Sequence, residues 1–517
     1  MKRFGIILIF ILSMMVNIYY GVQKSGFHED EYYTYFSSNR SLGLYQPDRE
    51  WQDRQTILDE FAVKEGEGFN YGLVKLVQSW DVHPPLYYWI FHTVCSFKPG
   101  IFSKWSGIIT NLLAFSIAFY LLYLLLRELS GNYAIISLAL SFWGMNPQTV
   151  SCNMLIRMYA WLSVFVFACA LLHVRMIKNG QSIKRILGIM LASFLGFLTQ
   201  YFYLFFFVAI GFSYTVYNVF FRKKIKESAL YVTSCAVSLM LAVVAYPSCL
   251  SHMFGGYRGS DAAGSMFDIG NTFMRVSFFT GLLNDFVFAG GLLYIAIALI
   301  AVYLIKLIRK KLSSKNSFEP AFICLILGAA GYFLLTSKAA LLVGAASNRY
   351  EMPVYGIIVA IVFVLFQKLM LSGKEVCYVV KKRSIIIAAV ICLLLLAKGH
   401  FVDGRVLFLY PEDVQKIAYA KENKDETAVV MFNPASAHNV WRLTDELLMY
   451  SKVFYMDEEN LEMVVDETVA ASDKIILYVA DDDVQSDAIT MLMESAELCD
   501  ITEISSEDMW TTYELGK

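Results

Sequence analysis

The sequence predicts an all-α polytopic membrane protein of about eleven transmembrane helices, followed by a small extracytoplasmic α/β domain. Two observations carry this prediction. Hydrophobic residues make up 57% of the 517 residues, whereas a soluble domain contains about 45–50%. The first 400 residues also contain repeated uncharged apolar runs, which reach the roughly 20 residues that a membrane helix needs.

The first predicted span follows the basic start Met1-Lys2-Arg3. We interpret it as an uncleaved helix, because its apolar run is long for a signal peptide and no A-x-A site follows. A shorter apolar run, Leu86 to Phe97, predicts a re-entrant or interfacial helix. The eleven predicted spans are 4–22, 105–126, 133–150, 160–177, 186–200, 202–221, 228–249, 286–306, 319–337, 353–371 and 384–400.

Loop charges predict the orientation of these spans, because cytoplasmic loops are enriched in Lys and Arg. With eleven spans and a cytoplasmic N-terminus, all four basic clusters fall inside; they occupy residues 175–185, 222–226, 306–315 and 374–383. The same topology places residues 23–104, residues 250–285 and the C-terminal tail outside.

The tail differs from the rest of the chain in charge. Residues 401–517 contain 26 acidic and 8 basic side chains, a formal charge of −18, which leaves +16 for the remainder. Such asymmetry indicates separate environments. We therefore expect a transmembrane domain at 1–400 and an acidic domain at 401–517. Within the tail, the sequence predicts strands at Thr427–Phe432 and Lys474–Ala480 and helices at Pro411–Lys424, Ala437–Tyr450 and Val484–Leu498.

Composition also excludes some classes of function. The chain has no excess of positive charge, so nucleic acid is not an expected partner. Its nine Cys residues include no C-x-x-C pair, so neither a zinc site nor a redox motif of that kind is supported.

Polar residues gather at the predicted outer ends of the spans, while the span interiors carry almost no charge. Transporters and proton pumps usually place ionisable residues near mid-depth, so this distribution favours chemistry at the outer membrane face. The candidates are Asp30 and Glu31 after the first span, His83 before Pro84-Pro85 with Tyr87 behind it, Arg157 and Tyr159 at the fourth span, and Arg349, Tyr350 and Glu351 before the tenth.

Each candidate has a simpler interpretation. Asp30 and Glu31 fit a solvated helix end, or they fit a divalent metal, since hard cations prefer carboxylate oxygens. Arg157 and Arg349 fit interfacial anchors. The outer loop 250–285, with its glycines and Tyr257, fits a lid over a site.

The ordered set of motifs resembles a known group. The acidic pair, His83-Pro84-Pro85-Leu86-Tyr87-Tyr88, Ile156-Arg157-Met158-Tyr159-Ala160 and Asn348-Arg349-Tyr350-Glu351-Met352-Pro353 occur in the order found in that group. The chain is similar over roughly residues 1 to 400 to the GT-C membrane glycosyltransferases, in the branch of protein mannosyltransferases and aminoarabinose transferases (glycosyltransferase family 39).

The resemblance implies a polyprenyl-phosphate sugar donor in the membrane. It makes Asp30 and Glu31 the catalytic acids, with Asp30 as general base, and makes His83, Arg157 and Arg349 the donor phosphate site. Tyr87, Tyr159, Tyr257 and Tyr350 would position substrates. The chain departs from the family where Asn153 to Tyr159 lacks the second acid of aminoarabinose transferases, which puts a two-carboxylate metal site in doubt.

The expected function is therefore transfer of a sugar, with inversion, to an envelope acceptor that is a protein, a lipid or a glycan. No cofactor is required by this scheme, although a divalent metal at Asp30 and Glu31 remains an option. A multi-pass protein of a bacterial plasma membrane fits, with a cytoplasmic N-terminus and an extracytoplasmic C-terminal domain. The alternative is a polytopic transporter or lipid flippase without glycosyl transfer.

Overall fold

The computed structural model describes residues 2–39, 47–308, 319–371 and 378–517. The chain forms two compact units, neither of which is continuous in sequence. The helical unit contains Met1–Val22, Gln78–Tyr87 and Gly107–Leu407, and the mixed unit contains Gln23–Val77, Tyr88–Ser106 and Phe408–Lys517. Most of the predicted first outer loop thus packs with the C-terminal tail.

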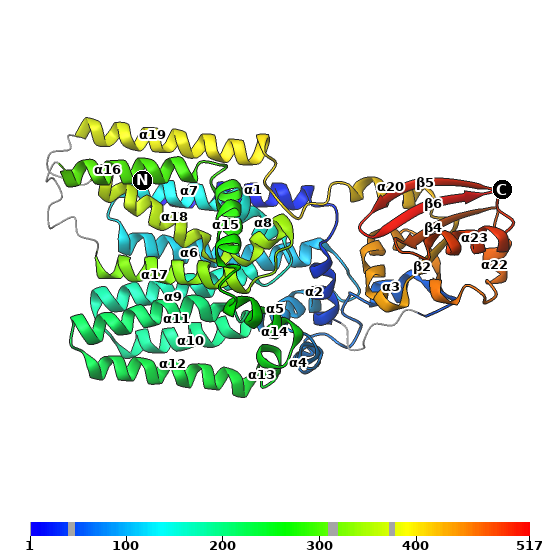
Figure 1. The fold of residues 1–517 in the computed structure, drawn as a ribbon, viewed down its shortest axis with the longest axis horizontal. Helices are drawn as coiled ribbons and strands as arrows, with labels where there is room; N and C mark the ends of the chain where they lie inside the picture. The colour runs from blue at the N-terminus through cyan, green and yellow to red at the C-terminus, as the bar shows by residue number, and fades with distance from the viewer. Residues whose placement is uncertain (1, 40–46, 309–318, 372–377) are drawn as a thin grey trace. The chain divides into compact units, whose positions relative to one another are not determined.

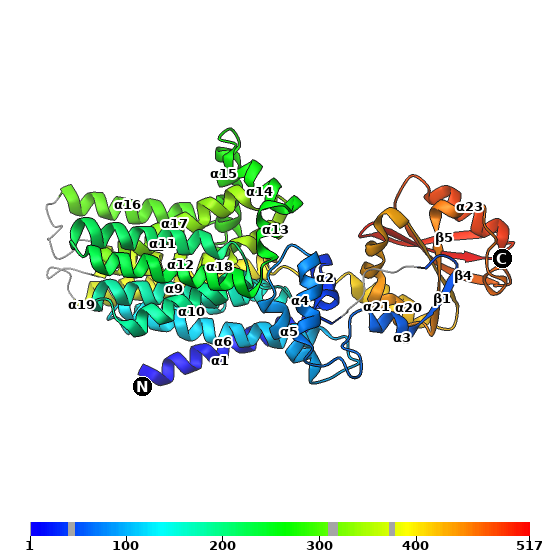
Figure 2. The ribbon, with the colours of Figure 1, turned by 90° about the horizontal axis from the view of Figure 1, so that it is seen from below.

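The helical unit consists of long apolar helices, several of which run side by side (Figures 1 and 2). Its helices are α1 (Lys2–Gln23), α6 (Lys104–Leu129), α7 (Tyr133–Gly144), α8 (Pro147–Met154), α9 (Tyr159–Asn179), α10 (Ile183–Thr199), α11 (Tyr203–Val216), α12 (Ile225–Ala245), α13 (Cys249–Phe254), α14 (Tyr257–Phe267), α15 (Thr272–Leu282), α16 (Leu292–Ile308), α17 (Pro320–Ala339), α18 (Met352–Phe366) and α19 (Tyr378–Ala397). Shorter helical turns are η1 (Tyr217–Phe221), η2 (Leu283–Val287), η4 (Gly344–Tyr350), η5 (Gln367–Leu371) and η6 (Lys398–Val402).

The predicted fold class, a polytopic helical membrane protein with a small C-terminal sheet domain, is confirmed, but the count of eleven spans is not. Eight helices in the described part of the chain are long and apolar enough to cross a membrane, or up to nine if one bent pair forms a single span. That pair, Thr272–Val287 and Leu292–Lys306, bends by 95°, and α15 accordingly runs across the other helices (Figure 1).

The predicted span 133–150 is broken in the structure. Helix α7 ends at Gly144, and α8 begins at Pro147, whose missing N–H costs nothing in the first turn of a helix. The side chain of Asn146 caps α8 by accepting a hydrogen bond from the backbone N–H of Gln148. The break keeps α7 too short for a crossing by itself and brings α8 to the start of α9.

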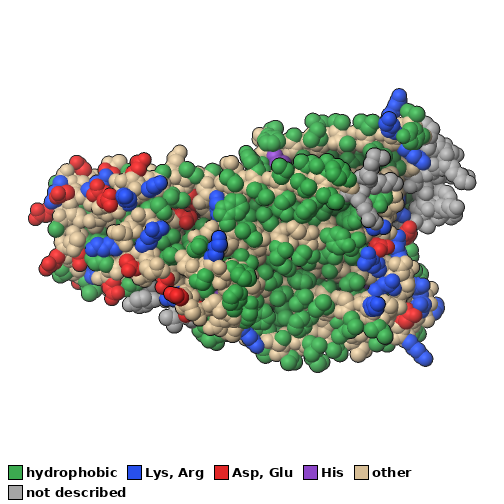
Figure 3. Space-filling view, turned by 180° about the vertical axis from the view of Figure 1, so that it is seen from behind, with side chains coloured by type: hydrophobic (Ala, Val, Ile, Leu, Met, Phe, Trp, Pro, Cys, Tyr) green, Lys and Arg blue, Asp and Glu red, His purple; other side chains and the backbone are tan. Residues whose placement is uncertain are grey.

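The outer surface of the helical unit is apolar over a broad area, and Lys and Arg side chains gather at one end of it (Figure 3). Two of the predicted basic clusters are in contact, because Arg222 donates to the carbonyl oxygen of Ile177 at 3.3 Å. A lipid bilayer is the environment in which exposed apolar side chains on many helices are stable.

The mixed unit is a three-layer α/β structure. Its sheet has the order β1-β3-β2-β4-β6-β5, in which β2 runs parallel to β3 and β4 and the other pairs are antiparallel. The strands are β1 (Glu50–Asp53), β2 (Thr427–Phe432), β3 (Lys452–Asp457), β4 (Lys474–Ala480), β5 (Asp500–Glu507) and β6 (Trp510–Gly516). The predicted strands at β2 and β4 are confirmed, and β1 is contributed by the first loop.

Helices cover both faces of this sheet. The helices and turns of the mixed unit are α2 (Glu29–Asn39), α3 (Arg54–Asp59), α4 (Tyr71–Trp80), α5 (Leu86–Ser96), α20 (Asp413–Glu422), η7 (Pro434–Leu443), α21 (Thr444–Leu447), η8 (Glu458–Asn460), α22 (Glu467–Ala470) and α23 (Gln485–Ser495). Some residues of α4 and α5 belong to the helical unit. One core packs α3, α20 and α21 on the sheet, and the other packs α22 and α23. The short helix expected over Leu86 to Phe97 is present as α5.

An aromatic cluster joins the first loop to the tail within the mixed unit. Trp441 of η7 packs against Tyr33 and Phe36 of α2 at ring distances of 5.1 and 4.8 Å, and against Phe61 at 5.7 Å. Large aromatic side chains bury enough apolar area to dominate such a contact. This packing fixes α2, which carries the predicted catalytic acids, against the tail.

Candidate functional site

The predicted acidic pair lies in the first turn of α2. Glu31 is fully buried, and its carboxylate accepts hydrogen bonds from Lys24 Nζ at 2.9 Å and from the backbone N–H of His28 at 2.5 Å. Lys24 is equally buried and also donates to the carbonyl oxygen of Phe408 at 2.8 Å. Because a buried ion pair with further hydrogen bonds has a fixed geometry, Glu31 fastens the start of α2 to the tail.

Asp30 is the accessible member of the pair, with 26% of its side chain exposed. Its backbone N–H donates to His28 Nδ1 at 3.1 Å, so that ring nitrogen is unprotonated. The first turn of a helix also favours a negative charge. Asp30 is therefore a partly exposed carboxyl group at the N-terminal end of a helix.

Asp81, His83 and Arg157 form a hydrogen-bonded series in the helical unit. His83 Nδ1 lies 3.0 Å from Asp81 Oδ2, and His83 Nε2 lies 3.2 Å from a terminal nitrogen of Arg157. A guanidinium group can only donate hydrogen bonds, so His83 Nε2 accepts the bond from Arg157. His83 Nδ1 then carries the hydrogen and donates it in a hydrogen bond to the Asp81 carboxylate. The ring of His83 thus connects the carboxylate of Asp81 to the guanidinium of Arg157.

The charge of Asp81 is stabilised within this series. Burial alone would raise the pKa of Asp81, but its interactions with His83 and Arg157 lower that pKa to about 2. Asp81 was not among the residues predicted from the sequence, because an acid two positions before a His in a loop reads as an ordinary solvated charge. Its proximity in sequence to His83 is the one signal that could have found it.

The turn between α8 and α9 positions Arg157. The amide of Asn111, on α6, donates to the carbonyl oxygens of Asn153 and Leu155 at 3.2 and 2.7 Å. The backbone N–H of Arg157 donates to the same Leu155 carbonyl at 2.7 Å. Arg157 itself is only 3% exposed. These hydrogen bonds fix the turn that carries Arg157, and the guanidinium itself contacts His83.

The structure brings together two of the places that the sequence singled out at span ends. The rings of Tyr159 and Tyr350 meet edge-on at 5.9 Å. The guanidinium of Arg349 lies over the ring of Tyr350 at 5.1 Å and donates to its hydroxyl at 3.3 Å. A cation over an aromatic ring is held without losing its charge. Tyr159, Tyr350 and Arg349 thus form one cluster at the N-terminal end of α9.

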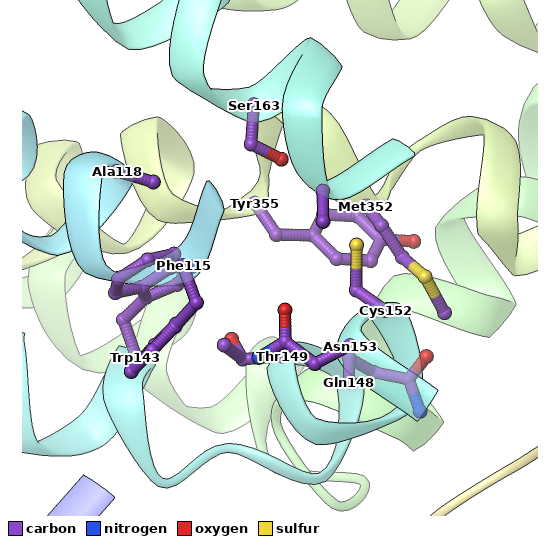
Figure 4. A pocket seen from close by; sticks show the side chains of 11 residues that line it. Phe115, Ala118, Trp143, Gln148, Thr149, Cys152, Asn153, Ser163, Met352 and Tyr355 are labelled. Carbon is purple, nitrogen blue, oxygen red and sulfur yellow. The ribbon is translucent and has the colours of Figure 1, made fainter. Parts of the chain in front are cut away.

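A small cavity with a volume of about 20 Å³ lies beside α8 (Figure 4). Figure 4 shows Gln148, Thr149 and Asn153 of α8 on one side and the rings of Phe115 and Trp143 on another. Asn153 also donates to the side chain of Asn17 at 2.8 Å. These polar contacts tie α8 to α1 and support the turn that carries Arg157.

The remaining predicted residues have varied surroundings. Tyr87 is completely buried at the start of α5, and the side chain of Tyr257 lies outside the described residues. Glu351 is buried and accepts a hydrogen bond from Ser337 at 3.4 Å. In the described part of the chain no group of three or more His, Cys, Asp or Glu residues could hold a metal ion. Asp30 and Glu31 meanwhile have different partners, His28 and Lys24.

Residues 82–246 match the family model described as dolichyl-phosphate-mannose-protein mannosyltransferase. A comparison with curated proteins finds no match.

Two solved structures show the fold. ArnT from Cupriavidus metallidurans bound to undecaprenyl phosphate is similar with a TM-score of 0.52 and 11% identity, over 98% of this chain and 97% of that one. Archaeal oligosaccharyltransferase AglB from Archaeoglobus fulgidus, in complex with an inhibitory peptide and a dolichol-phosphate, is similar with a TM-score of 0.50 and 11% identity, over 99% and 74%. The chain therefore shares the fold of these two structures, which is the fold that the resemblance in the sequence predicts.

Proposed function

We propose that this protein transfers a sugar from a polyprenyl-phosphate-linked donor to an acceptor outside the cytoplasm, with inversion at the anomeric carbon. The observation that supports it most is Arg157, a buried guanidinium oriented through His83 by Asp81. It occurs in a chain whose fold is shared by proteins solved with undecaprenyl phosphate and with a dolichol-phosphate.

The donor phosphate is the leaving group and gains negative charge as the glycosidic bond breaks. Arg157 and Arg349 stabilise that charge by bidentate hydrogen bonds. The sequence places His83 at the phosphate site, but in the structure its ring nitrogen Nε2 lies 3.2 Å from a terminal nitrogen of Arg157. In the proposed mechanism His83 therefore orients Arg157, and Arg157 contacts the phosphate.

Asp30 acts as general base toward the acceptor hydroxyl. The hydroxyl loses its proton to Asp30 as its oxygen attacks the anomeric carbon from the face opposite the phosphate. One displacement inverts the configuration, and a single base is enough. The buried pair of Glu31 and Lys24 holds the helix turn on which Asp30 lies, and Tyr159 and Tyr350 bound the phosphate site.

We place the protein in a bacterial plasma membrane, with its N-terminus cytoplasmic and the mixed unit extracytoplasmic. A lipid-linked donor reaches such a site from within the bilayer, held there by its apolar tail. No soluble nucleotide sugar is then needed.

The test is Asp30→Asn in a purified assay with a lipid-linked sugar and an envelope extract as acceptor. We expect unchanged expression and thermal stability but loss of transfer by at least about 100-fold, since general base catalysis contributes typically 10²–10⁴-fold. Asp59→Asn is the matched control, because Asp59 is an acid of the same loop in a surface pair with Lys64.

Substantial transfer by the Asp30→Asn protein would refute the assignment of the base. A wild-type protein that moves labelled lipid between leaflets without forming any glycosylated product would favour the flippase instead.

A further inference from the structure

The mixed unit contains a groove that the proposed transfer chemistry leaves unassigned. It has a volume of about 570 Å³ and lies between α20 and the strands β4, β5 and β6. β5 is an edge strand of the sheet. Specific ligand pockets usually occupy about 300–1,000 Å³, so the groove has room for two or three sugar rings.

The lining combines aromatic rings with hydrogen-bonding groups. Tyr419 supplies a partly exposed ring, and Gln415, Ser505, Ser506 and Thr512 supply amide and hydroxyl groups. The ring of Tyr478 is only 2% exposed and forms part of the core beneath the groove. A pyranose presents an apolar face that packs on a ring and hydroxyl groups that need hydrogen-bond partners. Tyrosine serves both needs, since it joins an apolar body to a polar tip. Ile504 and Pro411 are the other apolar side chains of the described lining, too few for a lipid or an apolar peptide.

One carboxyl group in the groove is deeply buried. Glu446 is only 4% exposed, and Lys416 Nζ lies 4.0 Å from its carboxyl group, beyond hydrogen-bond distance. Lys416 instead pairs with Asp413 at 2.7 Å and with Glu507 at 3.7 Å. The two oxygens of a carboxyl group that lines a cavity can form further hydrogen bonds with a ligand.

The charge of the lining selects among ligands. The carboxylates of Glu412 and Glu507 accompany a single lysine, Lys416, among the described lining residues. Carboxylates repel a phosphate or a uronate, so the groove is no second donor site. A neutral sugar or an amino sugar meets no such penalty.

A continuous set of contacts leads from the groove to the proposed base, within the same compact unit. Glu507 lines the groove, and the next residue, Asp508, lies 3.8 Å from Arg442. The same guanidinium pairs at 2.5 Å with Glu29, which immediately precedes Asp30. Asp508 and Met509 both have positive φ, at 56° and 70°. A side chain other than glycine rarely adopts such angles, and this strain is of the kind found at functional sites.

We infer that this groove binds a neutral or amino-sugar glycan through Tyr419, Gln415, Glu446 and Lys416, and that it presents the acceptor of the transfer reaction. The second part rests on the proposed function, and the first does not. The ring of Tyr419 packs on a sugar face, and the amide, carboxyl and ammonium groups form hydrogen bonds with the hydroxyl or amino groups of the sugar.

The test uses full-length protein in nanodiscs and three probes: chitotriose, its fully de-N-acetylated form, and a trigalacturonate. Binding is followed by saturation-transfer NMR and by titration. Gln415→Trp fills the groove from an exposed position on α20. Lys421→Trp is the matched control, because Lys421 is exposed on the same helix and is not part of the lining.

We expect the wild type and Lys421→Trp to bind chitotriose or its amino form, and Gln415→Trp to bind at least about tenfold more weakly. The trigalacturonate should bind least. Binding of the anionic probe above the others, or equal binding by Gln415→Trp, would overturn the inference.

The transfer assay separates the two proposals. If Asp30-dependent transfer occurs but none of the probes binds to the wild type, the groove assignment fails and the proposed function stands. If the probes bind as expected but no sugar is transferred to any acceptor, the groove is a glycan site and both its acceptor role and the proposed function fail.

Discussion

Single side chains carry most of the proposed chemistry, and His83 shows how. Its ring is hydrogen-bonded at both nitrogens, to Asp81 on one side and to Arg157 on the other. A ring fixed in this way cannot turn, so the guanidinium that it touches has a defined direction. His83 is thus a positioning residue in our scheme, not a phosphate ligand.

Replacing His83 tests this role. We expect His83→Ala to lower kcat/KM by about 10–100-fold, because Arg157 loses its orientation while keeping its charge. His83→Gln should recover part of the loss, since an amide can donate to Asp81 and accept from Arg157. The measurement is kinetics of sugar transfer alongside thermal unfolding of each variant. Equal activity of the two variants would contradict a positioning role.

The residues of the site were only partly accessible to sequence reasoning. Arg157 and Arg349 stand beside prolines, aromatics and span ends, so their position in the pattern attracts attention. Asp81 and Lys24 have no such pattern, because their partners are set by how loops fold. The burial of Glu31 was equally hidden, since nothing in a run of acids tells which one faces inward.

Among the elements, strands with a clear apolar run were predictable and the others were not. β2 and β4 each have a nearly continuous apolar run, as buried parallel strands do. β1 is only four residues long and mostly polar, and β5 is exposed along most of its length. Both are edge strands, for which hydrophobic pattern is weakest. The break at Asn146-Pro147 was likewise missed because apolar content continues on both sides.

The β5–β6 hairpin allows a test at the level of one element. Its turn places Asp508 and Met509 at positive φ, where a β-hairpin turn strongly prefers glycine. Met509→Gly should relieve this strain and stabilise the mixed unit by about 0.5–1 kcal/mol. Chemical unfolding followed by the fluorescence of the tryptophans provides the measurement. A decrease in stability would mean that the Met509 side chain contributes more than the turn geometry costs.

On the scale of the whole molecule, orientation in the membrane can be read with a native probe. Cys499 is the exposed free cysteine among the described residues, and the others described are buried or partly buried. With the mixed unit outside, a membrane-impermeant maleimide should label intact cells, and Cys499→Ser should abolish that label. Labelling that requires prior permeabilisation would reverse the predicted topology.

The stability of the mixed unit should also depend on pH. Burial, followed by repulsion from other acids, raises the pKa of Asp445 to about 7 and that of Glu446 to about 8. Burial, together with Asp482, raises the pKa of Glu458 to about 9. The folded state then binds more protons than the unfolded state between about pH 4 and pH 9. Stability is therefore greatest at acidic pH and falls as pH rises through this window.

We expect the free energy of unfolding to fall by at least about 1 kcal/mol between pH 5 and pH 9. Urea unfolding at several pH values measures the slope. Glu458→Gln should flatten it at the alkaline end, because an amide does not ionise. A slope that is flat in the wild type, or unchanged in the variant, would contradict the raised pKa values.

The pairing of β1 with β3 has a consequence for biogenesis. Asp53 pairs with Lys452, so the two strands are separated by roughly 400 residues of chain. At about 5–20 residues per second, a ribosome needs about 20–80 s to supply the second strand after the first. During that delay β1 has no partner strand, and in a product truncated before β3 it would never gain one. Quality-control proteases and holding chaperones on the side where this loop emerges would therefore meet every copy before its last hundred residues arrive.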